Sequence, residues 1–116
     1  MTTEFTIEEH FANKSPLVND IYKRLMSKLN NFGPVVEEAK KSSIHLVNRS
    51  AFAGVATRKS YLLLNIKSAV PLDSPRFHKA EQISASRFHQ EIKLARLEDI
   101  DQELIDWLMA AYELSA

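Results

Sequence analysis

The sequence predicts an α+β fold: a curved, mostly antiparallel sheet of four to six strands, with N-terminal helices and a C-terminal helix packed against it. Two observations carry this prediction. Residues 15–29 and 100–112 repeat apolar side chains at three- and four-residue steps, which is typical of amphipathic helices. Residues 44–67 alternate with a period of two, which is typical of strands. A chain of 116 residues fits one domain, spanning 1–116.

Two helix starts precede the predicted sheet. Thr6–Glu9 has the spacing of a capping box, so a short helix should follow and end near Asn13. Ser15–Pro16 places a cap before a proline at the first helical position, and a longer helix should run from there to a stop at Gly33–Pro34. For residues 35–41, the flanking Gly-Pro and the strand that follows favour an extended segment over a helix.

The middle of the chain reads as strands joined by short turns. Residues 44–48, 51–57 and 61–67 form the first three, and residues 88–94 alternate in the same way. Residues 76–83 form either a strand or a short helical turn. Leucines on both faces of the third strand indicate a central position in the sheet.

The last helix is capped by either Asp99 or Asp101, and the acidic side chains around its start are favoured by the helix dipole. This structural role explains the acidic cluster without a metal ion. We expect Trp107 of this helix to anchor the core together with Phe52 and the pair Leu62 and Leu64.

Several function classes are excluded or disfavoured by composition. There is no cysteine, so disulfides and thiolate metal sites are impossible, which fits a cytoplasmic protein. Two glycines cannot build a glycine-rich phosphate loop, and no metalloprotease or serine-hydrolase motif is present. No apolar run reaches membrane-spanning length, and the first residues do not have the pattern of a signal peptide. We expect no cofactor, no metal and no membrane association.

Charge is unevenly distributed along a chain whose net charge is zero. Residues 40–95 carry ten basic and three acidic side chains, whereas residues 1–39 and 96–116 are both net acidic. A basic sheet segment suggests an anionic partner. The alternative is that acidic helices simply offset a basic sheet within one fold.

One face of the predicted sheet gathers polar and basic side chains. By strand parity, His45 and His89 point away from the face that carries Leu46 and Ile92. This face could hold a phosphate or a nucleotide, or it could be the solvated face of an antiparallel sheet. The candidate binding residues are His45, Arg49, Tyr61, Asn65, Lys67, Arg87, His89 and Lys93.

A second cluster repeats a short pattern, in Ser74–His78 and again in Ser86–His89. Aromatic side chains among basic ones occur in proteins that bind single-stranded nucleic acids. The alternative is that Phe77 and Phe88 are inward core residues flanked by outward basic ones.

Three functions remain open from these residues. The first is a non-enzymatic binding module whose basic sheet face contacts nucleic acid or a nucleotide. The second is a protein-interaction or accessory domain, or a homodimer, without a small ligand. The third is a small enzyme that uses His45 or His89 with Tyr61; it ranks lower because the sequence offers no paired carboxylate or nucleophile, and we assign no catalytic residue.

The closing helix carries a specific pattern, Ile-Asp-x-Glu-Leu-x-x-Trp-Leu-x-x-Ala-Tyr, over Ile100–Tyr112. Together with Gly33–Pro34, Phe52–Ala53, Leu62–Leu64 and Ser74–Arg76, it covers most of the chain. In these features the chain resembles a small bacterial family of uncharacterised α+β domains. More distantly it is similar to YjbR/MmcQ-type proteins, small α+β domains sometimes called DNA-binding. Neither resemblance implies a catalytic residue.

Overall fold

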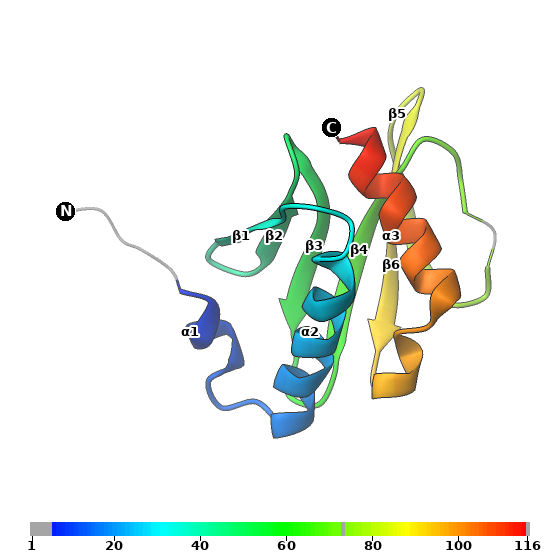
Figure 1. The fold of residues 1–116 in the computed structure, drawn as a ribbon. Coiled ribbons are helices and arrows are strands. Elements are labelled where there is room, and N and C mark those ends of the chain that lie inside the picture. The colour runs from blue at the N-terminus through cyan, green and yellow to red at the C-terminus, as the bar shows by residue number, and fades with distance from the viewer. Residues whose placement is uncertain (1–5, 73, 116) are drawn as a thin grey trace.

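A computed structural model describes residues 6–72 and 74–115 as a six-stranded antiparallel sheet with helices on one face (Figure 1). The strands are β1 (Val36–Ala39), β2 (Ile44–Val47), β3 (Ala51–Thr57), β4 (Leu62–Ser68), β5 (Phe77–Ser84) and β6 (Arg87–Leu94). The helices are α1 (Ile7–Phe11), α2 (Pro16–Leu29), the short 3₁₀ helix η1 (Leu97–Asp99) and α3 (Gln102–Leu114). The predicted α+β class is confirmed.

The strand order is β1-β2-β3-β4-β6-β5, and every neighbouring pair is antiparallel. The first four strands therefore form a meander, and the β5–β6 hairpin joins it through β6. The segment at 35–41 is extended, as expected, and the uncertain segment at 76–83 is a strand. Within the described residues, no helix is long and apolar enough to cross a membrane.

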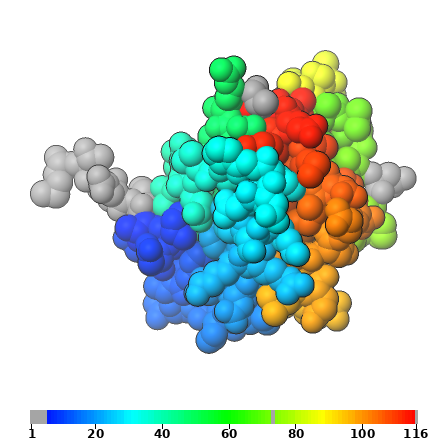
Figure 2. All heavy atoms as spheres, viewed as in Figure 1, coloured from blue at the N-terminus to red at the C-terminus, as the bar shows by residue number. Residues whose placement is uncertain are grey.

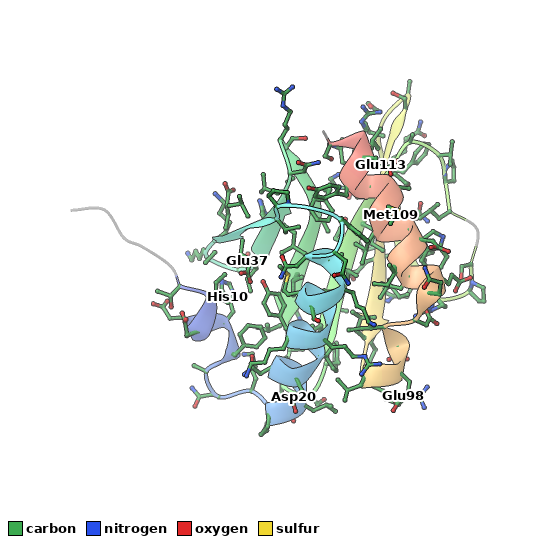
Figure 3. All side chains as sticks on the ribbon, viewed as in Figure 1. His10, Asp20, Glu37, Glu98, Met109 and Glu113 are labelled. Carbon is green, nitrogen blue, oxygen red and sulfur yellow. The ribbon has the colours of Figure 1, made fainter. Side chains whose placement is uncertain are left out.

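Helices α2 and α3 lie side by side across one face of the sheet (Figure 1). Seen from that side, their side chains form the surface of the molecule (Figure 2). Helix α1 joins the same layer, because the Phe11 ring lies 5.0 Å from the Tyr22 ring of α2. The imidazole of His10 donates to the carbonyl of Lys40 over 2.8 Å, which ties α1 to the β1–β2 turn near Glu37 (Figure 3).

The Tyr22 hydroxyl donates a 2.5 Å hydrogen bond to the carboxylate of Glu37 on β1. Burial, followed by this hydrogen bond and the charge of Glu37, raises the pKa of Tyr22 well above its ordinary value. The phenol is therefore a structural link between α2 and the edge strand β1, and it keeps its proton near neutral pH.

The turn between α2 and β1 depends on glycine. Helix α2 ends at Leu29, ahead of the Gly33–Pro34 stop that the sequence suggests. Gly33 has φ of 145°, and a Cβ built on it would lie 2.7 Å from the hydroxyl oxygen of Tyr112. That hydroxyl donates to the Pro34 carbonyl over 2.9 Å, so α3 packs directly against the turn.

The hydrophobic core lies between the sheet and the two long helices. Phe52, Leu62 and Leu64 are fully buried, as predicted. Trp107 is not: it lies partly exposed at the rim of the core, where its ring packs 4.8 Å from that of Phe77. The expectation that Trp107 is a central core anchor is therefore corrected, because it faces the outer strand β5 rather than the central strands.

Arg76 joins the loop before β5 to the start of α3. Its guanidinium donates to both carboxylate oxygens of Asp101, at 2.9 and 3.0 Å, and to Glu103 at 3.0 Å. It also donates to the Asp99 carbonyl at 2.7 Å and lies 5.7 Å from the centre of the Trp107 ring. The acidic cluster at this helix start is thus held by an arginine, in keeping with the structural explanation drawn from the sequence.

Asp101 is the N-cap of α3, since its carboxylate accepts from the Leu104 amide at 3.0 Å. Burial alone would raise the pKa of Asp101, but the Leu104 amide and the Arg76 guanidinium together hold it below its ordinary value. Burial likewise opposes the charged form of Arg76, and its bonds to Asp101 and Glu103 outweigh that effect and raise its pKa. Of the two caps considered, Asp101 is the one used.

Candidate functional site

The face of the sheet opposite α2 and α3 carries a row of four residues paired across the strands. His45 of β2 lies opposite Gly54 of β3, Gly54 lies opposite Asn65 of β4, and Asn65 lies opposite Glu91 of β6. We call this surface the open face. Lys67 and His89 are paired on the same face, two residues further along β4 and β6.

A hollow of about 430 Å³ lies in the open face. Its volume falls within the range of sites for small molecules, roughly 300–1,000 Å³. Strand β3 runs through it, and the side chains of its neighbours stand around it. The lining residues are Ser42, Ser43, His45, Ala51, Phe52, Ala53, Gly54, Val55, Ala56, Arg58, Leu63, Asn65, Lys67, His89 and Glu91.

The hollow exists because β3 presents small residues to the open face. Strand alternation places Gly54 and Ala56 on the open face. Ala51 also lies on this face, on the other side of an irregularity in the pairing of β3 with β2. At that irregularity Phe52 is the extra residue of a bulge, and its ring packs edge-on against Tyr112 on the helix side, 5.3 Å away. The bulge thus removes the one large side chain of β3 from the open face.

Gly54 forms the floor of the hollow. A Cβ built at this position would meet nothing within 4 Å, so no side chain occupies the space above it. The bulge of β3 lies at Phe52 and not at Gly54, although a glycine within a strand suggests a bulge there. Gly54 therefore keeps the floor open and has no demanding backbone conformation of its own.

Three polar side chains of the hollow already have partners. The Arg58 guanidinium donates to the carbonyl of Thr57 at 3.1 Å. Glu91 accepts a 2.7 Å hydrogen bond from the imidazole of His78 on the outer strand β5. The Lys67 ammonium donates to Ser115 at 3.2 Å, and more weakly to Ser50 and Ala51 at 3.5 Å. It thereby links β4 to the end of α3 and keeps a fixed position at one end of the hollow.

On the strands that line the hollow, three other polar side chains stand free. Among the hydrogen bonds of residues 6–72 and 74–115, none involves the side chain of His45, Asn65 or His89. Each is only partly buried, so water can satisfy it. These groups are therefore available to a ligand at little cost in broken protein contacts.

The eight candidate residues divide into two groups. His45, Asn65, Lys67 and His89 line the hollow together. The other four do not line it. Arg49 lies in the β2–β3 turn, and Arg87 begins β6 with its guanidinium on the carbonyl of Ser86. Tyr61 is covered by the Lys93 ammonium, 4.4 Å from the centre of its ring.

The structure adds lining residues that the sequence did not single out. Glu91 alternates with His89 along β6, so strand parity could have placed it, but a search for basic residues passed over it. Arg58 follows β3, and Ser42 and Ser43 follow the turn after β1; only the pairing of distant strands brings them to the same hollow. A glycine within a strand can also allow the close approach of a neighbour, whereas the effect of Gly54 is to leave space.

The lining gives the hollow a positive bias. Arg58 and Lys67 are cationic, and Glu91 is the one carboxylate that lines it. Within the described part of the chain, no three His, Asp or Glu side chains gather in a way that could hold a metal ion. The arrangement offers hydrogen-bond donors and positive charge, which suits an anionic ligand.

The structure does not bring the components of the enzyme hypothesis together. Tyr61 is engaged by Lys93 and lies outside the lining, whereas His45 and His89 line the hollow. The structure does contain one pair of a histidine and a carboxylate, His78 with Glu91. The imidazole of this pair is about half exposed and lies on the edge strand β5. No hydroxyl is hydrogen-bonded to a histidine imidazole among the described residues.

A family model described as a domain of unknown function, DUF5655, matches residues 7–115. This agrees with the resemblance to an uncharacterised family. The comparisons do not show the more distant likeness to YjbR/MmcQ-type proteins. No curated protein and no solved structure gives a match.

Proposed function

The chain belongs to the DUF5655 family of domains of unknown function, and we propose that it is a non-enzymatic binding module that holds a nucleotide-sized anion in the hollow of its open face. One observation carries the proposal. Free polar groups from β2, β4 and β6 converge on a hollow whose floor, Gly54, is kept clear of side chains. A sheet face serving only as a solvated surface needs no such convergence.

The size of the hollow favours a small molecule over a long nucleic acid. At about 430 Å³ it can accommodate a group the size of a nucleotide. A protein that tracks single-stranded nucleic acid usually presents a longer basic groove with several aromatic stacking surfaces. On the open face, Tyr61 is already covered by Lys93 and lies outside the lining. The aromatic rings that line the hollow on this face are the imidazoles of His45 and His89.

Positive charge supports an anionic ligand. Arg58 is exposed at one end of the hollow, and Lys67 lies in place at the other. A phosphate between an arginine and nearby serine hydroxyls gains charge-assisted hydrogen bonds, which are stronger than neutral ones. Ser42 and Ser43 supply such hydroxyls in the lining.

The test is an amide-shift NMR titration with AMP, GMP, CMP and UMP, added as an equimolar mixture at low and then moderate salt. Shifts that gather on residues 43–45, 54–58, 65–67 and 89–91 support the proposal. Inorganic phosphate, added separately, shows whether an anion alone suffices. Shifts that are absent, or that scatter over the surface without saturating, contradict the proposal and favour an interaction domain.

A matched pair of arginine and lysine variants locates the anion. Arg58 lines the hollow, whereas its neighbour Lys59 is also exposed and does not line it. We expect Arg58→Gln to weaken nucleotide binding by about tenfold, the usual range for losing a hydrogen bond to a charged group. Lys59→Gln should leave the affinity within about twofold, because an exposed charge that does not line the hollow is largely screened by water and salt. Equal losses would indicate unspecific attraction to a basic surface.

A further inference from the structure

We infer that the ligand of this hollow is a guanine nucleotide, whose base is recognised by Asn65 and Glu91; this inference rests on the proposed function. Asn65 and Glu91 are directly paired on neighbouring strands, and both line the hollow. Paired side chains have Cβ atoms about 4.5–5.5 Å apart, so their polar ends can contact adjacent atoms of one planar ring.

The chemistry of this pair matches one base edge. A carboxylate is a pure acceptor with two oxygens, and an amide nitrogen is a donor. Guanine presents two neighbouring donors, its ring N–H and its exocyclic amino group, beside a carbonyl acceptor. Glu91 can take both donors while the Asn65 amide donates to the carbonyl. The hydrogen bond from His78 uses one lone pair of a single Glu91 oxygen and leaves the others available.

The other bases fit this pair less well. Adenine and cytosine each place a ring acceptor beside the amino group, and that acceptor would face a carboxylate oxygen of Glu91. Uracil offers one ring donor between two carbonyls, so its carbonyls would meet the same negative charge. Like partial charges held together in this way are unfavourable and provide discrimination.

The hollow leaves space for the base between the pair Asn65 and Glu91 and the side of the hollow that carries Arg58. Gly54 separates Asn65 from His45 in the cross-strand row, and the strands carrying these two residues lie two spacings apart, about 10 Å. A planar base can lie over Gly54 with its edge toward β4 and β6. The ribose and phosphate then extend toward His45 and Arg58, away from the carboxylate of Glu91.

The experiment is calorimetric titration of the protein with GMP, IMP, AMP and CMP, each alone. We expect GMP to bind about tenfold or more tightly than AMP or CMP, the usual discrimination of a bidentate contact. IMP lacks the exocyclic amino group and should lie between them. In Glu91→Gln, the amide offers one acceptor and one donor, which matches adenine. The variant should therefore lose about tenfold for GMP without losing affinity for AMP.

Glu81→Gln is the control, because Glu81 is an exposed carboxylate of β5 on the same side of the sheet that does not line the hollow. Its affinities should equal those of the unaltered protein. Equal binding of all four nucleotides, unchanged in Glu91→Gln, would overturn guanine recognition and leave the anion-binding proposal standing. Failure of every nucleotide to bind would overturn the proposed function itself.

Discussion

Replacing Arg76 by alanine should lower the free energy of unfolding by about 2–3 kcal/mol. The two carboxylate partners, Asp101 and Glu103, are about half exposed, so each ion pair contributes roughly 0.2–1 kcal/mol after solvent screening. The hydrogen bond to the Asp99 carbonyl adds about 1 kcal/mol. Stacking on Trp107 adds about 0.5–1 kcal/mol. The same substitution also releases the loop that precedes β5.

Urea unfolding followed by circular dichroism measures this loss, and Arg96→Ala is the matched control. Arg96 is more exposed, and its one ion pair, to Asp99, is long at 3.8 Å. We expect that variant to cost less than about 0.5 kcal/mol. Arg76→Lys should recover less than half of the loss, since lysine lacks the planar fork that reaches three partners. Similar small losses for Arg76→Ala and Arg96→Ala would refute the view that Arg76 holds the loop to α3.

Three further predictions concern stability. Trp107→Ala should lower the free energy of unfolding, measured with urea, by about 2–3 kcal/mol. This loss is smaller than the roughly 3–5 kcal/mol expected for Phe52→Ala, because Trp107 lies at the rim of the core. A larger loss for Trp107→Ala than for Phe52→Ala would place Trp107 in the core. Gln90→Leu should lower the free energy of unfolding by about 2 kcal/mol, because the buried Gln90 amide is hydrogen-bonded to both the backbone N–H and the carbonyl of Leu72. Differential scanning calorimetry measures this loss, and an unchanged melting temperature would contradict it. The lowered folded-state pKa of Asp101 stabilises the fold above the unfolded-state pKa, and this contribution is lost as pH falls through the folded value. Stability measured between pH 5 and 2.5 should therefore fall less in Asp101→Asn, and equal slopes would contradict the assignment.

Strand parity predicted the sheet face correctly where the strands are regular. Leu62 and Leu64 are buried under the helices, and Asn65 and Lys67 lie on the opposite face, as alternation requires. The helix starts followed equally local rules, since capping residues act within one turn. These features were predictable because each depends on residues close together in the sequence.

The hollow could not be predicted in the same way. It depends on the order and register of four strands, which place Gly54 between His45 and Asn65. It also depends on the bulge that turns Phe52 toward α3, which no local pattern marks. For the same reason, strand parity alone placed Tyr61 with the histidines. In the structure, the Tyr61 ring is instead in contact with the ammonium of Lys93 on the neighbouring strand.

The proposal that the open face is a ligand site is tested most directly at Gly54. A valine there meets no atom within 4 Å at its Cβ, and β-branched residues are favoured in strands, so Gly54→Val should fold with an unchanged or higher melting temperature. Its side chain would occupy the floor of the hollow. We predict that the folded variant loses the nucleotide-induced amide shifts seen in the unaltered protein. A folded Gly54→Val protein that binds nucleotides with the original affinity would contradict a site in this hollow.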